Sequence, residues 1–147
     1  MACGLDSKTS SINSNWGKRT GKHMSTRLLI CDDSSFSRKS IKKSLPEEMD
    51  LEVDEVGLGE EAIALCSEGK VDLLFLDLNM PGMDGFQVLE QLRDQGFSSP
   101  IIVITANIQS APSKRAKDLG ARAVLQKPIN QQKVSQLMSY LAKEGSL

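Results

Sequence analysis

The stretch from Val71 to Gly85, VDLLFLDLNMPGMDG, constrains the fold more than any other part of the chain. It begins with large apolar side chains that lead directly to the carboxylate of Asp77, and the turn-forming residues Pro81 and Gly82 follow. A short apolar run closed by turn residues is typical of a strand that is buried on both faces. Ligands bind at the carboxyl ends of the strands in open α/β sheets, so Asp77 is predicted to lie where chemistry can occur.

Short apolar runs alternate with helical patterns along the rest of the chain. The predicted strands are Leu28–Cys31, Leu51–Val56, Leu73–Asp77, Ile101–Thr105 and Ala123–Gln126. The predicted helices run from Ser34 or Ser35 to Leu45, from Gly59 to Gly69, from Phe86 to Gln95, from Ser113 to Leu119, and from Asn130 to about Leu141. In the first helix we expect one face to carry Phe36, Ser40, Ile41 and Leu45. This alternation predicts one α/β domain with a parallel sheet that is covered on both faces.

The first part of the chain differs from the rest in composition. Residues 1–23 are polar and show no apolar periodicity, and His23-Met24 resembles a cloning junction. These residues do not resemble a signal peptide, because they contain no apolar central region. We therefore expect residues 1–23 to be a disordered, vector-derived leader and residues 24–147 to form the domain. Whether this domain stands alone or belongs to a longer protein stays open at this point.

Charge and cysteine content limit the classes of partner. The formal net charge is −1, from 18 Lys and Arg residues against 19 Asp and Glu residues. This balance predicts no direct binding to nucleic acid or to acidic membranes, and the apolar runs are too short to span a bilayer. The three cysteines form no paired spacing, which indicates buried thiols in the reducing cytoplasm.

Four of the five predicted strands end in residues that can act on a phosphate group. These residues are Asp32 with Asp33, Asp77, Thr105 and Lys127. Each has an ordinary structural explanation by itself, but parallel strands bring all of them to the same edge of the sheet. Three neighbouring carboxylates repel one another in a partly buried site, and a hard divalent cation such as Mg²⁺ offsets that repulsion. The sequence therefore predicts a magnesium and phosphate site at this edge.

The segments LLICDDS, LLFLDLNMPGMDG, VITA and KPI occur in the order seen in one large family. Over about residues 26–141 the chain resembles the receiver domains of bacterial two-component response regulators, of the CheY-like type. The resemblance implies a doubly wound, flavodoxin/CheY-like sheet of strand order 2-1-3-4-5 with five helices. It also implies a cytoplasmic signalling phosphoacceptor, which assists its own phosphorylation and dephosphorylation, and not a conventional enzyme.

The resemblance assigns the central chemistry to Asp77. This residue would accept a phosphoryl group from the phosphohistidine of a sensor histidine kinase or a phosphotransfer protein. By the same resemblance, Asp33 and Asp77 would bind Mg²⁺ directly, together with the backbone carbonyl of Asn79. Asp32 would act mainly through a bound water molecule.

The resemblance also implies how a phosphorylated Asp77 would change the domain. Lys127 would pair with a phosphate oxygen, and the Lys127-Pro128 bond is expected to be cis. The Thr105 hydroxyl would turn towards the phosphate and shift the loop that follows it, which would alter binding to a downstream protein or output domain. Val124 departs from the family pattern, because an aromatic residue often stands at this position and swings as part of the switch.

Three other functions fit parts of this pattern. A haloacid-dehalogenase-type phosphatase needs a second acid two residues after the nucleophile, and Asn79 stands there. A flavodoxin would place its flavin phosphate near Asp32 and Asp33, which would repel it. A pseudo-receiver that only binds other proteins is disfavoured because every expected site residue is present, although it stays the main alternative.

Overall fold

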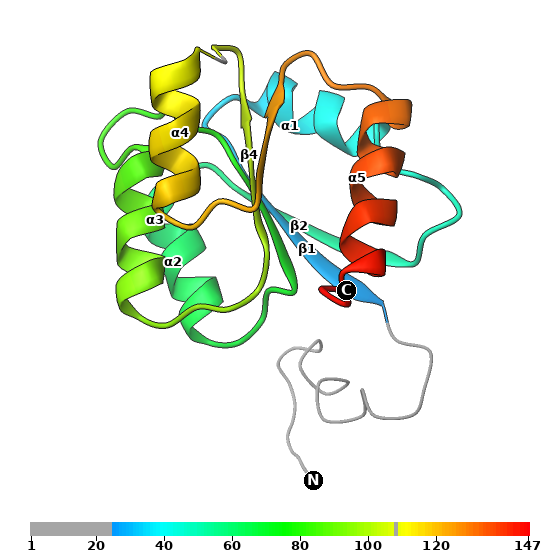
Figure 1. Cartoon of the computed structure of the whole chain (residues 1–147), viewed down its shortest axis with the longest axis horizontal. Coiled ribbons are helices and arrows are strands. Elements are labelled where there is room, and N and C mark those ends of the chain that lie inside the picture. The colour runs from blue at the N-terminus through cyan, green and yellow to red at the C-terminus, as the bar shows by residue number, and fades with distance from the viewer. Residues whose placement is uncertain (1–24, 108) are drawn as a thin grey trace, which may run out of the picture.

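The computed structural model describes residues 25–107 and 109–147. The predicted leader, residues 1–23, lies outside the described residues, so its assignment stays a prediction. Within the described part of the chain, five strands alternate with five helices (Figure 1). In chain order they are β1 (Thr26–Cys31), α1 (Ser35–Lys43), β2 (Leu51–Val56), α2 (Gly59–Ser67), β3 (Leu73–Leu76), α3 (Gly85–Asp94), β4 (Ile101–Thr105), α4 (Ser110–Asp118), β5 (Ala123–Gln126) and α5 (Gln131–Lys143).

The strands form one parallel sheet in the order β2-β1-β3-β4-β5, which confirms the predicted order. The register pairs Cys31 of β1 with Leu76 of β3, and Thr105 of β4 with Gln126 of β5. Each of these residues lies at or next to the carboxyl end of its strand. The polar residues that follow the strands are therefore delivered to one edge of the sheet.

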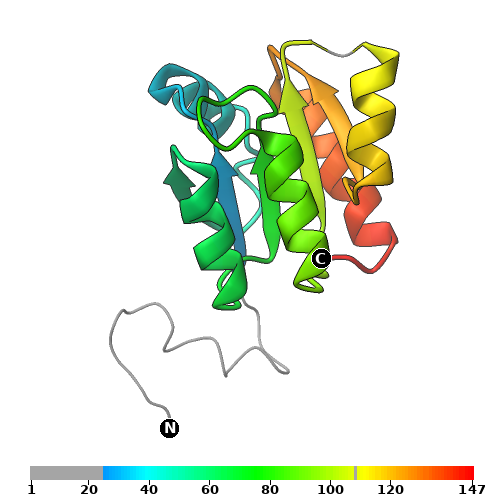
Figure 2. The ribbon, with the colours of Figure 1, turned by 90° about the vertical axis from the view of Figure 1, so that its left-hand side faces the viewer.

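Helices cover both faces of the sheet, as the alternation predicted. Figures 1 and 2 show α2, α3 and α4 on one face and α1 and α5 on the other. Side chains alternate between the two faces along a strand. In β3, Leu74 and Leu76 pack in the core beneath α2 and α3, whereas Leu73 and Phe75 pack in the core beneath α1 and α5. All four are buried, which confirms that this strand is covered on both faces.

Side-chain caps fix the starts of three helices. Ser34 caps α1, Asn130 caps α5, and Asp84 caps α3 in a capping box with Gln87. The start of α4 was predicted too late, because the helix begins at Ser110 and not at Ser113. Proline is tolerated in the first turn of a helix, so Pro112 does not prevent the earlier start.

The helix face predicted for α1 is wrong at Phe36. Ile41 of α1 is buried and Leu45 packs against the same core, but the Phe36 side chain is 80% exposed. Phe36 lies in the first turn of α1, next to the edge where β1 has already ended. Phe36 is also five residues before Ile41, which is about 140° around the helix at 3.6 residues per turn, so the two side chains lie on different faces of α1.

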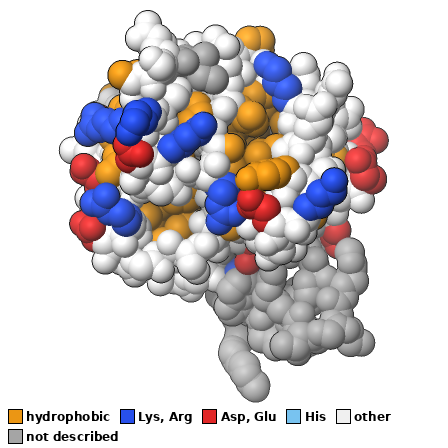
Figure 3. Space-filling model, in the orientation of Figure 1, with side chains coloured by type: hydrophobic (Ala, Val, Ile, Leu, Met, Phe, Trp, Pro, Cys, Tyr) orange, Lys and Arg blue, Asp and Glu red, His pale blue; other side chains and the backbone are white. Residues whose placement is uncertain are grey.

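Charged groups of both signs are spread over the face seen in Figure 3, with apolar side chains between them. That distribution agrees with the near-zero net charge of the chain. None of the helices in the described part of the chain is long and apolar enough to span a membrane. Cys31 and Cys66 are buried free thiols, as predicted, while Cys3 lies outside the described residues.

Candidate functional site

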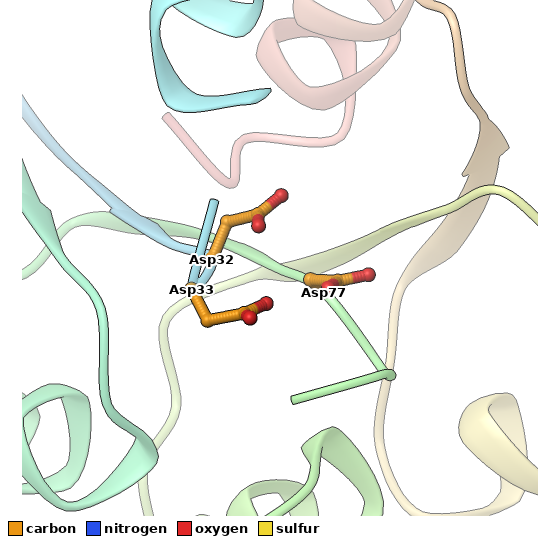
Figure 4. A group of neighbouring side chains, drawn as sticks. All are labelled: Asp32, Asp33 and Asp77. Carbon is orange, nitrogen blue, oxygen red and sulfur yellow. The ribbon is translucent and has the colours of Figure 1, made fainter. Parts of the chain in front are cut away.

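Three carboxylates meet at the carboxyl edge of the sheet. Oxygen atoms of Asp32, Asp33 and Asp77 all lie within 4.8 Å of one another. Figure 4 shows the three side chains extending from the ends of β1 and β3 into a common space. The pairing of these strands extends to this point, because the Asp77 N–H donates to the Cys31 carbonyl at 3.0 Å. The adjacency of β1 and β3 in the sheet is therefore what brings these acids together.

An ammonium group that follows β5, two strands away from β3 in the sheet, compensates part of this negative charge. The Lys127 Nζ atom lies 2.7 Å from Asp32 Oδ2 and 3.6 Å from Asp77 Oδ1. The Lys127 backbone N–H donates to the Thr105 carbonyl at 2.8 Å, which ties the residue to the end of β4. The Lys127-Pro128 bond is cis, as expected. Lys127 thus contacts two of the three acids from a fixed position.

Asp32 is held more firmly than the sequence indicated. Its side chain is almost completely buried, with 1% exposure. Oδ1 accepts the Ser34 N–H at 2.9 Å, and Oδ2 accepts the Ser37 hydroxyl at 2.6 Å in addition to Lys127. The Arg38 guanidinium also donates to the Asp32 backbone carbonyl at 2.6 Å. Sequence reasoning assigned Ser34 only to capping and missed Ser37, although both follow Asp32 within five residues.

Asp77 lies in an environment that favours its protonated form. Its side chain is buried, and burial together with the charges of Asp32 and Asp33 raises its pKa from 3.8 to about 6. Lys127 and the backbone N–H of Asn79 act in the opposite direction and lower the pKa. Asp77 is therefore mostly ionised at neutral pH, and it gains strongly from any further positive charge.

The remaining predicted site residues are Thr105 at the end of β4 and Asn79 in the loop after β3. Thr105 is almost fully buried at the end of β4, and its hydroxyl oxygen accepts the Asn107 N–H at 3.3 Å. The Asn79 side chain is exposed two residues after Asp77. Val124 is half-buried on β5 and packs against the core beneath α2 and α3.

The donor set fits a hard divalent cation such as Mg²⁺. All side-chain ligand atoms in the cluster are carboxylate oxygens, which magnesium prefers. The Cys31 thiol lies nearby, but burial and the charges of Asp32 and Asp77 raise its pKa to about 12. Its sulfur lies 3.7 Å from the sulfur of Met80, so this thiol belongs to the apolar packing and not to the ligand set.

The family of the chain follows from comparison with known proteins. The family model for the response regulator receiver domain matches residues 28–139. The chain belongs to the response regulator receiver domain family. Receiver domains act in two-component signalling, and the fold and the acidic edge described above agree with that assignment.

Curated relatives of this receiver domain include bacterial and plant regulators. It is 33% identical over 121 residues to the transcriptional regulatory protein ResD of Bacillus subtilis, covering 82% of this chain and 50% of ResD. It is 33% identical over 116 residues to the two-component response regulator 24 of Arabidopsis thaliana, covering 78% of this chain and 81% of that protein. The receiver domain thus spans about half the length of ResD.

Solved receiver structures show the same fold. The receiver domain of AraT from Geobacillus stearothermophilus superimposes with a TM-score of 0.73 at 32% identity, covering 82% of this chain and 95% of that one. A chain of the CheX-CheY-BeF3-Mg complex from Borrelia burgdorferi gives a TM-score of 0.72 at 29% identity, covering 79% of this chain and 89% of that one.

Proposed function

We propose that this receiver domain accepts a phosphoryl group on Asp77 in a magnesium-dependent reaction. The donor would be the phosphohistidine of a sensor histidine kinase or of a phosphotransfer protein. The observation that carries the proposal is the meeting of Asp32, Asp33 and Asp77 with the Lys127 ammonium at one edge of the sheet. Phosphoryl transfer depends mainly on positioning and on neutralising the charge of the transferred group, and this arrangement supplies both.

The transfer converts one covalent bond into another. A carboxylate oxygen of Asp77 attacks phosphorus and forms a new P–O bond, which makes an acyl phosphate. The P–N bond to the donor imidazole breaks and the imidazole keeps the electron pair, so a ring that carries a proton on its other nitrogen leaves as neutral imidazole. Because the pKa of Asp77 is about 6, the attacking carboxylate is ionised at neutral pH.

Asp33, Asp77 and the backbone carbonyl of Asn79 would hold Mg²⁺, with Asp32 acting through a bound water molecule. When bound, the ion supplies charge neutralisation at the phosphoryl oxygens. The oxygen-only cluster supports this ligand set. The similarity to a chain of a complex that includes BeF3 and Mg supports it as well.

Lys127 and Thr105 would bind the phosphoryl group once it is on Asp77. The Lys127 Nζ atom needs to move only a short way, because it already lies 3.6 Å from Asp77 Oδ1. The Thr105 hydroxyl would turn towards the new anion and pull on the loop after β4, which leads into α4. Because position 124 is valine, this change would proceed without an aromatic swing. The altered surface would then act on a downstream protein or on an output domain in the same parent protein.

The exposed ring of Phe36 offers a contact for the phosphodonor protein. It lies in the first turn of α1, three residues after Asp33, and is 80% exposed. A large exposed aromatic side chain beside a reactive site is typical of a protein-binding surface. We propose that the donor protein covers Phe36 while its phosphohistidine reaches Asp77. The buried free thiols of Cys31 and Cys66 support placing this reaction in the reducing cytoplasm.

Acetyl phosphate tests the proposed function without a partner. Incubation with acetyl phosphate and Mg²⁺, followed by intact mass measurement, should show one added phosphoryl group on the wild type. Asp77→Asn should take up none, whereas Asp54→Asn on the exposed face of β2 should behave as wild type. Chelation of Mg²⁺ should abolish the adduct. A wild type that takes up no phosphoryl group would support the pseudo-receiver alternative.

A second assay tests the surface around Phe36. Phe36→Ala should slow phosphorylation by a phosphorylated histidine phosphotransfer domain but leave phosphorylation by acetyl phosphate unchanged. The control is Tyr140→Ala, which removes another exposed aromatic ring, on α5. Equal slowing with both donors would contradict a docking role for Phe36.

A further inference from the structure

Ser37 makes a contact that the proposed reaction does not yet explain. Its hydroxyl donates to Asp32 Oδ2 at 2.6 Å, and Lys127 Nζ donates to the same oxygen at 2.7 Å. The Ser37 backbone N–H donates to the Ser34 side chain at 3.1 Å, which fixes the first turn of α1. Ser37 is therefore positioned so that its hydroxyl and the Lys127 ammonium both donate to the same oxygen of Asp32.

This sharing matters because Lys127 has two possible acceptors. In the unphosphorylated domain its Nζ lies 2.7 Å from Asp32 and 3.6 Å from Asp77. When a phosphoryl group arrives on Asp77, the ammonium must turn from Asp32 towards the new oxygens. Asp32 has 1% exposure and cannot obtain replacement hydrogen bonds from bulk water. A buried carboxylate that loses a donor without replacement is costly.

We propose that Ser37 is a positioning residue of the phosphoryl-acceptor site. By holding Asp32 Oδ2, the Ser37 hydroxyl keeps that carboxylate satisfied when Lys127 turns towards the phosphoryl group. The Ser34 N–H donates to Asp32 Oδ1 and keeps that oxygen hydrogen-bonded in the same way. Ser37 thus lowers the cost of releasing Lys127, and it acts through Asp32 and Lys127 without touching the phosphoryl group. This inference rests on the proposed phosphorylation of Asp77.

The test compares phosphorylation rates with acetyl phosphate at saturating Mg²⁺. In this assay the P–O bond to acetate breaks, acetate keeps the electron pair, and a P–O bond to Asp77 forms. Ser37→Ala should slow the reaction by about tenfold, the effect of losing one hydrogen bond to a charged group. Ser37→Thr keeps the hydroxyl and should stay close to the wild-type rate. Ser35→Ala removes a neighbouring exposed hydroxyl and should leave the rate unchanged.

A double-mutant cycle separates positioning from a general structural role. In a Lys127→Ala background there is no ammonium to release, so adding Ser37→Ala should have little further effect. Equal fold-losses in both backgrounds would overturn the proposal, and so would a wild-type rate for Ser37→Ala. If Ser37→Ala fails to fold, Ser37→Cys replaces it, because a thiol is a much weaker donor and should also slow the reaction.

The two proposals fail in different ways. A wild-type protein that takes up no phosphoryl group from acetyl phosphate would overturn the proposed function and the role of Ser37 with it. A wild-type protein that is phosphorylated, with a Ser37→Ala variant that matches it, would overturn only the role of Ser37.

Discussion

Gly85, at the start of α3, packs directly against the backbone of Asp77. A Cβ atom at position 85 would lie 2.6 Å from the Asp77 carbonyl oxygen and 2.7 Å from the Cα atom of Leu78. The Gly85 N–H also donates to the Leu78 carbonyl at 3.0 Å. The start of α3 therefore packs closely against the loop after β3. This close approach is possible because Gly85 has no side chain, and it fixes the backbone of Asp77.

Replacing Gly85 should disturb this closure. Gly85→Ala should lower the free energy of unfolding by about 1–3 kcal/mol, because the two nearest atoms that the new Cβ would meet belong to the backbone and cannot swing aside. Urea denaturation measures the loss. The matched control is Gly57→Ala, whose Cβ would lie 3.4 Å from the tip of the Arg38 side chain and 4.0 Å from the Asp32 carbonyl oxygen, which are ordinary contact distances. Equal stabilities for Gly85→Ala and Gly57→Ala would show that the loop is not closely packed.

Removing the Asp77 charge should stabilise the metal-free domain in a pH-dependent way. The pKa of Asp77 is about 6 in the folded state and 3.8 in the unfolded state, so the folded state holds its proton more tightly. The tighter proton binding of the folded state contributes its full stability below about pH 4, where both states are protonated. This contribution falls as the pH rises and is lost once the pH passes 6, where both states have lost the proton. In the presence of a chelator, Asp77→Asn should therefore exceed wild type by up to about 3 kcal/mol above pH 6 and match it below about pH 4.

Thermal and urea unfolding across this pH range check the prediction. Asp54→Asn, exposed on β2, serves as the charge-matched control and should stay close to wild type throughout. A stabilisation by Asp77→Asn that is the same at pH 4 and pH 7 would point to packing and not to charge. Added Mg²⁺ should narrow the difference at neutral pH, because it stabilises only the protein with the intact cluster.

Lys127 should be most important for stability when magnesium is absent. Lys127→Met removes the ammonium that pairs with buried Asp32, and breaking a buried pair on one side costs about 3–5 kcal/mol. Mg²⁺ should restore part of this loss by supplying replacement positive charge. Unfolding with and without Mg²⁺ measures both effects. Lys117→Met on the exposed side of α4 should change little in either condition.

The position of α4 should depend on a contact with α3. The Arg115 guanidinium lies over the Phe86 ring, 4.2 Å from its centroid, and Ala116 is the only buried residue of α4. A cation–π contact contributes about 0.5–1 kcal/mol at an exposed site, which is large for a helix with so little buried surface. Arg115→Gln should therefore speed amide hydrogen exchange across α4 more than across α3.

Lys114→Gln is the matched control for Arg115→Gln. Lys114 pairs with Asp118 one turn along α4 at 2.9 Å, and both side chains are well exposed, so this pair adds little to the docking of the helix. Exchange in α4 that rises equally for both variants would mean that net charge, and not the Phe86 contact, sets the stability of the helix.

Local patterns in the sequence predicted much of the fold because each pattern has one strong physical cause. Leu73–Leu76 is apolar on both faces, so it had to be an interior strand. Asn130 was expected as a cap, and its side chain accepts the Lys133 N–H at 2.8 Å. The weak apolar pattern of α4 gave no such anchor, and its start was therefore placed three residues too late.

The sequence could not predict contacts that depend on how two elements meet. Lys127 follows a predicted strand, but only the structure shows that its Nζ atom lies 2.7 Å from Asp32 Oδ2. Ser37 looks like an ordinary polar residue near a helix start until the structure brings Asp32 and Lys127 to it. These positions are decided by tertiary packing, which periodicity does not describe.

The sequence by itself determined which residues form strands and helices, and that acids, a threonine and a lysine stand at the ends of the strands. It could do so because burial and helix capping act over a few neighbouring residues. Only the tertiary structure decided that Lys127 pairs with Asp32, that Ser37 shares the same oxygen, and that Asp77 has a pKa of about 6. These properties arise from distances between elements that are far apart in the chain, and charge and burial act through those distances.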